Sequence, residues 1–221
     1  MASLAVGFLA GAVWGWLADR LAGRWPAHPD GSVRSPDWRT LIVVALSGVG
    51  GGLFALRVAN AGWGGSWMVL AAAYFLALAV LLATDLDQRL LPDLLTLPMA
   101  GVTLVVTAAG LNPLVGGGLV GGGVGFWGAL LVAVAVPLGL WAASLPFGPG
   151  AIGSGDLKLL VSVGLLCGPW RTLYALLSGA MVMAVVLVAL LVVRRISLRS
   201  HVPMGPFLIV GTAWAILGPG G

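Results

Sequence analysis

Long apolar stretches separated by short polar loops dominate this chain of 221 residues. Apolar residues make up 60% of it and charged residues 8%, and its mean hydropathy is +1.08. Inside a bilayer every backbone polar group needs an internal partner, so helices and closed barrels are the structures that cross it. The pattern predicts an all-α polytopic bundle of about eight transmembrane helices in one domain covering residues 1–221. The expected spans are Leu4–Leu17, Leu41–Leu56, Trp67–Thr84, Leu94–Leu111, Val115–Leu145, Leu157–Trp170, Thr172–Val193 and Met204–Leu217.

The basic residues predict the orientation of this bundle, because loops on the cytoplasmic side of a membrane carry an excess of Lys and Arg. With eight alternating spans, nine of the eleven basic residues fall on one face, and only Arg57 and Arg171 fall on the other. All seven aspartates lie on the basic face as well. We therefore expect both termini on the outer side of the plasma (inner) membrane, and any ionisable chemistry at the cytoplasmic face.

The remaining composition excludes several function classes. No basic patch is interleaved with aromatic residues, so the net charge of +4 indicates topology and attraction to anionic lipid, with no nucleic-acid partner. Cys167 is the only cysteine, which leaves no intrachain disulfide and no CxxC metal site.

Gly117, Gly121 and Gly125 recur every fourth residue and favour close helix packing. The polar loop 22–40 is too short for a soluble domain, and we interpret it as a linker or a lipid-facing loop.

Two short stretches, 85–93 (DLDQRLLPD) and 153–158 (GSGDLK), hold four of the seven aspartates. Asp85 ends the third expected span, where the helix dipole disfavours a negative charge. Asp93 and Asp156 each precede an apolar run, so either one alone is explained as an N-cap. Asp87, beside a glutamine and an arginine, is typical of a solvated loop charge.

Topology distinguishes Asp85 and Asp156 from the other aspartates. The third expected span runs inward and ends at Asp85, while the sixth begins at Asp156 and runs outward, so both side chains are expected near the inner mouth of the bundle. If Trp170 marks the outer interface, Asp156 lies about 21 Å below it along a helix. That depth is inside the protein, where an ionisable group is a functional hypothesis by default.

These stretches resemble a known family. GSGD at Gly153, Gly155 and Asp156 matches the GxGD signature of membrane-embedded aspartyl proteases, and with Lys158 it is similar to the GxGDxK form of prepilin peptidases, the type IV leader peptidases. Asp85, followed by Pro92 and Asp93, resembles that family's first catalytic segment. VPMGPFLIVG, which contains Pro203, Gly205 and Pro206, resembles the PFGPFL segment of the family, with Met204 in place of the usual Phe.

The resemblance implies a function and assigns roles residue by residue. Asp85 and Asp156 correspond to the two catalytic aspartates, and the other matched positions support the site. The implied activity is an aspartic endopeptidase that removes the basic leader of type IV prepilins or pseudopilins, substrates with an N-terminal leader followed by a hydrophobic helix, at the cytoplasmic face. Asp87 and Asp93 are not assigned catalytic roles. For Lys158, a role in binding a substrate carbonyl or holding the local field and simple interfacial anchoring are equally open. Residues 203–207 are also explained as a helix start.

This chain departs from the family pattern in its first inner loop. Many bacterial members have there an insertion with paired CxxC sequences that bind zinc, and a second activity that methylates the new N-terminus with S-adenosylmethionine. Loop 22–40 stands in place of that insertion and has no cysteine. The expectation is therefore proteolysis without a cofactor or a metal, and S-adenosylmethionine is expected only if methylation is retained.

Ordinary carboxylate chemistry predicts the mechanism, and one other function class uses the same residues. Two close carboxyls share a proton, so one acts as general base on a water and the other as general acid. The alternative is a proton-coupled transporter or channel with Asp85 and Asp156 as relay sites. Against it, the aspartates gather at one face, and the sequence shows no inverted repeat.

Overall fold

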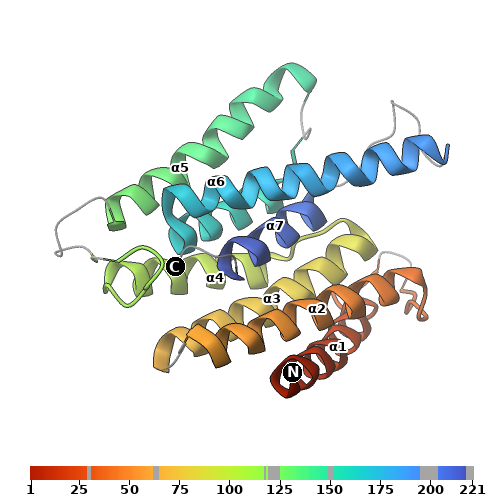
Figure 1. The fold of residues 1–221 in the computed structure, drawn as a ribbon. Helices are drawn as coiled ribbons and strands as arrows, with labels where there is room; N and C mark the ends of the chain where they lie inside the picture. The colour runs from red at the N-terminus through yellow and green to blue at the C-terminus, as the bar shows by residue number, and fades with distance from the viewer. Residues whose placement is uncertain are drawn as a thin grey trace.

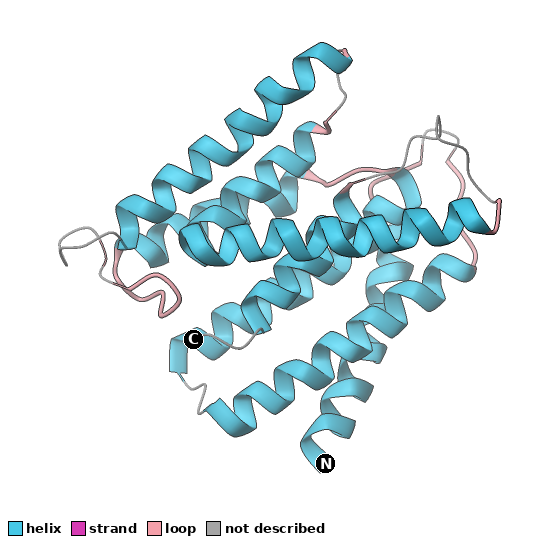
Figure 2. Ribbon diagram, turned by 45° about the horizontal axis from the view of Figure 1, so that its top comes forward, coloured by secondary structure: helices cyan, strands magenta, loops and turns pink. Residues whose placement is uncertain are grey.

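The computed structural model describes residues 1–28, 31–61, 65–116, 118, 125–148, 152–194 and 204–217, and these residues form an all-helical bundle without strands (Figure 1, Figure 2). The elements are α1 (Ala2–Ala22), α2 (Trp38–Ala61), α3 (Gly65–Gln88), α4 (Asp93–Ala108), α5 (Gly125–Ser144), the short 3₁₀ helix η1 (Leu145–Phe147), α6 (Ser154–Val192) and α7 (Gly205–Leu217).

The all-α class is confirmed, but the count of eight helices is not. The described residues contain seven α-helices, because the sixth and seventh expected spans both lie in α6. Five helices, α1, α2, α3, α5 and α6, are long and apolar enough to cross a membrane, while α4 and α7 are apolar but shorter. The fifth helix begins at Gly125 rather than at Val115. This pattern of apolar helices is that of a multi-pass membrane protein.

Close contacts between small residues hold the helix pairs together. Gly7, Gly11 and Gly15 on α1 face α2 so closely that a methyl group on Gly11 would overlap the Ser47 carbonyl. Without a hydrophobic driving force between helices in lipid, such backbone contact supplies van der Waals attraction. Of the glycines expected to pack, Gly125 lies on the Gly116 carbonyl, and Gly117 and Gly121 lie outside the described residues.

The short helix α7 lies between the α1–α3 group and the α5–α6 pair (Figure 1). Its C-terminal carbonyls are satisfied by the two basic residues expected on the outer face. Arg57 donates to the Leu217 carbonyl at 2.6 Å, and Arg171 donates to the Ala215 carbonyl at 2.7 Å. The last carbonyls of a helix lack intrahelical partners and carry the negative end of its dipole, so both cations stabilise this end.

The helix α6 is broken at Gly168, which has φ +66° and ψ −175°. Pro169 has no N–H to donate to the Leu165 carbonyl four residues earlier. Thr107 and Asn112 replace the lost bond: the Thr107 hydroxyl donates to the Leu165 carbonyl at 3.1 Å, and the Asn112 amide donates to the Leu166 carbonyl at 2.9 Å. The break separates residues 154–167 from 169–192, close to the boundary expected between the sixth and seventh spans.

Replacing Asn112 should therefore destabilise the bundle at this break. Asn112→Leu is expected to cost about 1–3 kcal/mol, because it leaves buried carbonyls without a donor. Thr212→Val is the matched control, since the buried Thr212 hydroxyl donates only within its own helix, to the Leu208 carbonyl. Thermal unfolding in detergent measures the difference, and equal losses in the two variants would contradict this role of Asn112.

Candidate functional site

Asp85 lies in the last turns of α3 and is 5% exposed. Within the described residues its Oδ2 atom has no hydrogen-bond partner. A buried carboxylate oxygen without a partner is costly, and the negative end of the helix dipole adds to that cost. Asp85 is therefore placed where stability alone does not explain it.

The N-terminus of α7 covers the carboxyl group of Asp85. Gly205 is the first residue of this helix, and a Cβ atom on Gly205 would lie 2.6 Å from Oδ2 and 3.0 Å from Oδ1 of Asp85. Only a glycine leaves room for the carboxyl here. Pro206 follows in the first turn of α7, and Pro203 lies outside the described residues. The segment that resembles PFGPFL therefore lies directly on Asp85, the first residue of the segment that ends at Asp93.

Asp156 approaches the same place from the first turn of α6. Its carboxyl is half-buried under Gly153, whose Cβ would lie 3.4 Å from Oδ2. Gly155 packs on Leu91, and a methyl group on Gly155 would lie only 2.8 Å from the Leu91 Cβ, so the GSGD turn rests on the segment that precedes Pro92. Asp85 and Asp156 are close enough for their charges to interact.

Lys158 and Asp93 form an ion pair between the first turns of α6 and α4. The Lys158 Nζ lies 2.6 Å from Oδ1 and 2.7 Å from Oδ2 of Asp93, and both side chains are exposed. The N-cap interpretation of Asp93 is wrong, because Pro92 occupies the N-cap position of α4 and the carboxylate binds Lys158 instead. Asp156 is not an N-cap either, since Gly153 holds that position for α6. Lys158 therefore ties the start of α6 to the start of α4.

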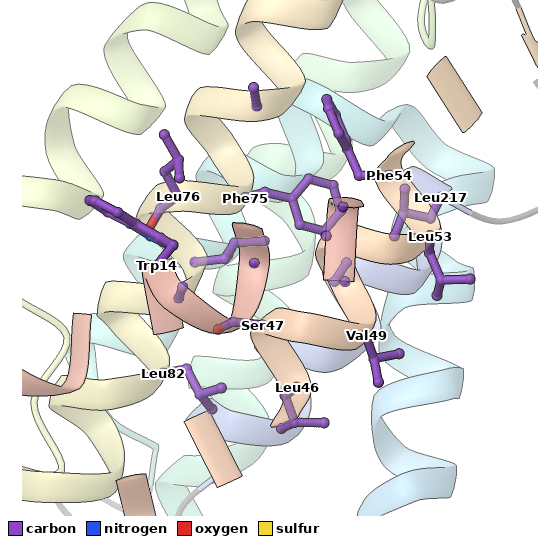
Figure 3. Close-up of a pocket in the computed structure, with 18 of the residues that line it drawn as sticks. Trp14, Leu46, Ser47, Val49, Leu53, Phe54, Phe75, Leu76, Leu82 and Leu217 are labelled. Atoms are coloured by element: carbon purple, nitrogen blue, oxygen red, sulfur yellow. The ribbon is translucent and has the colours of Figure 1, made fainter. Parts of the chain in front are cut away.

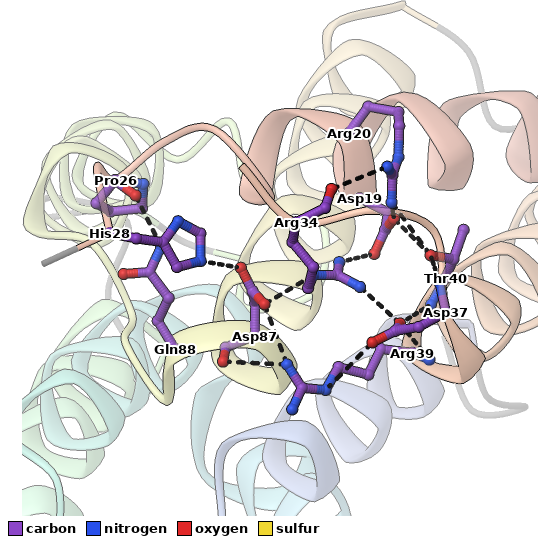
Figure 4. A network of polar contacts seen from close by, with 10 residues as sticks. All are labelled: Asp19, Arg20, Pro26, His28, Arg34, Asp37, Arg39, Thr40, Asp87 and Gln88. Atoms are coloured by element: carbon purple, nitrogen blue, oxygen red, sulfur yellow. Dashed lines mark hydrogen bonds and ion pairs between the residues drawn. The ribbon is translucent and has the colours of Figure 1, made fainter. Parts of the chain in front are cut away.

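Asp87 is not a solvated loop charge, which corrects the sequence-based interpretation. Its side chain is 2% exposed, lies 2.9 Å from Nε2 of His28 and forms ion pairs with Arg34 and Arg39 (Figure 4). Burial of a carboxylate requires such partners, and the loop before α2 and the first turn of α2 supply them. Asp37 caps α2 by accepting hydrogen bonds from the backbone N–H groups of Arg39 and Thr40.

The loop 22–40 is also more than a linker or a lipid-facing loop. Its described residues form an ion-pair network that joins the ends of α1 and α3 to the start of α2 (Figure 4). The network consists of Asp19, Arg20, His28, Arg34, Asp37, Arg39, Thr40 and Asp87, and we call it the inner network. Acidic and basic residues alternate through this short segment, and that balance is the sequence signal that could have revealed it.

Asp85 and Asp156 differ from the other described aspartates in that they lack an ion-pair partner. Six of the seven aspartates lie in the described residues, and four of these six, Asp19, Asp37, Asp87 and Asp93, have ion-pair partners. For Asp85 and Asp156 the described residues supply no ion pair. Two unpaired carboxyls close to each other are suited to general acid–base chemistry.

An apolar cavity of about 440 Å³ lies among α1, α2, α3 and α7 (Figure 3). Its walls include Trp14, Phe54 and Phe75, and it reaches Leu82, three residues before Asp85. Neither Asp85 nor Asp156 lines it. Hydrocarbon walls provide no groups for acid–base chemistry, so the chemistry of this site rests on the two aspartates.

The described residues include few His, Cys, Asp or Glu side chains that could bind a metal ion. Over the described ranges, no three His, Cys, Asp or Glu side chains come together as a metal site requires. Cys167 is buried at the break of α6 and has no disulfide partner.

The fold and the site define a polytopic membrane protein with two carboxyls that lack ion-pair partners among the described residues, one at the end of α3 and one at the start of α6, and sequence comparison gives its family. Residues 72–189 match the model of the type IV leader peptidase family. This range is more than half of the chain and includes both carboxyls, Asp93 and Lys158. The chain belongs to the type IV leader peptidase family.

Several curated relatives carry the name prepilin leader peptidase/N-methyltransferase. One from Stutzerimonas stutzeri is 30% identical over 156 residues, which cover 70% of this chain and 50% of the relative. Another from Aeromonas hydrophila is 32% identical over 161 residues, covering 71% and 50%. One from Neisseria gonorrhoeae is 30% identical over 190 residues, covering 84% and 57%. The chain thus spans about half the length of the curated relatives it matches. No solved structure matches it.

A methyl group on Gly205 should impair any reaction at Asp85. Gly205→Ala must displace the Asp85 carboxyl, and a misplacement of about 1 Å can cost ~100-fold in rate. Gly139→Ala is the matched control, because a methyl group there meets no atom within 4 Å. Peptidase turnover per folded molecule is the measurement. Unchanged turnover in Gly205→Ala would show that the reaction does not depend on the position of this carboxyl.

Proposed function

We propose that this chain is a membrane-embedded aspartic endopeptidase that cleaves the basic leader from type IV prepilins or pseudopilins at the cytoplasmic membrane face. The observation that carries the proposal is the convergence of Asp85 and Asp156, the two described carboxyls without an ion-pair partner, under glycines of two separate motifs. Membership in the leader peptidase family and the names of the relatives support it. No observation on the described residues favours the transporter alternative.

The proposed reaction needs only the two carboxyls and a water. Like charges close together are unfavourable, so the pair shares one proton, and one carboxylate remains as general base. This base takes a proton from water, which attacks the scissile carbonyl. The protonated partner donates a hydrogen bond to the developing oxyanion and then protonates the leaving amine. In this proposal proteolysis uses no metal and no cofactor.

The substrate enters from the bilayer with its hydrophobic helix, and its basic leader stays at the cytoplasmic face with the anionic lipid. The aspartates of the inner network and Asp93 already have cationic partners. Attraction of the leader therefore rests on lipid and on the two unpaired carboxyls rather than on a free acidic cluster.

The names of the relatives also include N-methyltransferase, and S-adenosylmethionine is the cofactor that the resemblance implies for that step. We propose proteolysis for this chain and expect methylation only if that second activity is retained, because loop 22–40 has no cysteine where many members have the zinc-binding insertion. The mass of the processed substrate, with S-adenosylmethionine present, distinguishes a methylated from an unmethylated N-terminus.

Cleavage of a tagged prepilin by the purified, lipid-reconstituted chain tests the proposal. The unmodified protein is expected to cut at the leader boundary. Asp85→Asn and Asp156→Asn are each expected to lose at least about 100-fold in rate, because each removes one partner of the acid–base pair. Both variants should insert and unfold like the unmodified protein. Retained turnover in either variant would remove that aspartate from the pair, and no cleavage by the unmodified folded chain would refute the proposed activity.

The proposed orientation predicts a labelling pattern in the inner membrane. Cys167 is buried, so it should not react, and single added cysteines report their own side. Arg24→Cys, at the inner loop, should be labelled by an impermeant maleimide only after the membrane is opened. Asn60→Cys, near the end of α2, should be labelled in intact cells. The reverse pattern would place the aspartates on the outer face and contradict the proposal.

A further inference from the structure

Arg34 makes more ion pairs than any other basic residue of the inner network (Figure 4). Each of its three guanidinium nitrogens contacts a different carboxylate. Nε lies 2.7 Å from Asp87 Oδ1, Nη1 donates to Asp37 Oδ1 at 2.6 Å, and Nη2 donates to Asp19 Oδ1. These aspartates belong to the end of α3, the N-cap of α2 and the end of α1. One side chain thus connects three helix ends.

A guanidinium is suited to this position and an ammonium is not. Its planar fork reaches several carboxylates at once, whereas a lysine is a single point charge. Burial by itself would lower the pKa of Arg34, but its hydrogen bond to Asp19 and the charges of Asp19, Asp87 and Asp37 raise that pKa above its usual value. The cation therefore stays charged, and the buried carboxylates of Asp19 and Asp87 stay compensated.

The inner network reaches Asp85 through the end of α3. Asp87 follows Asp85 by two residues, in the same final turn. Arg39 donates to the backbone carbonyl of Asp87 at 3.4 Å as well as contacting its carboxylate, and Gln88 donates to the Pro26 carbonyl at 2.7 Å. Arg34 and Arg39 place two positive charges at the C-terminus of α3, where they also complement the helix dipole. The last turn of α3 is therefore fixed to the loop before α2 and to the first turn of α2.

Little else fixes the carboxyl of Asp85 itself. Its Oδ2 has no hydrogen-bond partner among the described residues, and the neighbour that covers it is a glycine. Its position relative to Asp156 consequently depends on where the turn that carries it is held.

We propose that Arg34 is a positioning residue, which sets the place of Asp85 opposite Asp156 by holding Asp87 and thereby the last turn of α3. The kinetic part of this inference rests on the proposed function. The structural part does not, because it concerns the order of α3 without substrate.

The experiment compares Arg34→Met with Arg20→Met in the full chain in lipid. Arg20 is a matched control: it contacts Asp19, Thr40 and the Arg34 carbonyl in the same network, but it has no contact with α3 among its hydrogen bonds and ion pairs. Asp87→Asn, nearly isosteric, gives a second test if Arg34→Met fails to fold. Hydrogen exchange of residues 85–88 without substrate is measured first, followed by kcat and KM on a tagged prepilin.

Arg34→Met and Asp87→Asn are expected to speed exchange at 85–88 and to lower kcat about 10- to 100-fold with KM unchanged, and the double variant should be no slower than either single one. Arg34→Lys should not restore kcat, because it cannot bridge the three carboxylates. Arg20→Met should lower the unfolding temperature while its kcat per folded molecule stays the same.

Three results would overturn the inference: faster exchange confined to residues 23–37, an unchanged kcat in folded Arg34→Met, or an equal loss of kcat in Arg20→Met. If the unmodified protein does not cleave prepilin, the proposed function fails, and the exchange at residues 85–88 still decides the role of Arg34.

Discussion

The organisation of the charged end of this bundle depends on the cost of burying a carboxylate without a partner. In a protein that is mostly hydrocarbon, each buried negative charge needs a cation or several hydrogen-bond donors nearby. Asp19 and Asp87 meet this requirement through Arg20 of α1 and Arg34 of the loop before α2, and their ion pairs hold three helix ends together. Asp85 and Asp156 have no ion-pair partner among the described residues, and this exception marks the site.

Glycines allow the helix ends at this site to come close together. Gly205 and Gly153 let backbone lie directly on the two carboxyls, and Gly155 lets the start of α6 rest on the segment before Pro92. Larger side chains at these positions would separate the helix ends. The glycines therefore keep the carboxyls together, while the inner network fixes the turn from which Asp85 projects.

Sequence reasoning predicted the helical class and the segments that meet at the site. Apolar runs long enough for a bilayer, and two aspartates at the inner ends of predicted spans, were sufficient for that. It placed the boundary between the sixth and seventh spans close to the break at Gly168, but it did not predict how the lost hydrogen bond is replaced, because the donors Thr107 and Asn112 come from elsewhere in the chain. It also misjudged Asp87 and Asp93, whose partners lie 48 or more residues away.

The amino-acid sequence by itself therefore determined that the chain is a bundle of apolar helices and that its ionisable residues gather at a few positions, because hydropathy and the spacing of motifs are properties of the linear chain. Only the tertiary structure decided which aspartates are neutralised and which are not. Ion pairing depends on distances of a few ångströms between side chains from different helices, and such distances are set by packing rather than by order along the chain.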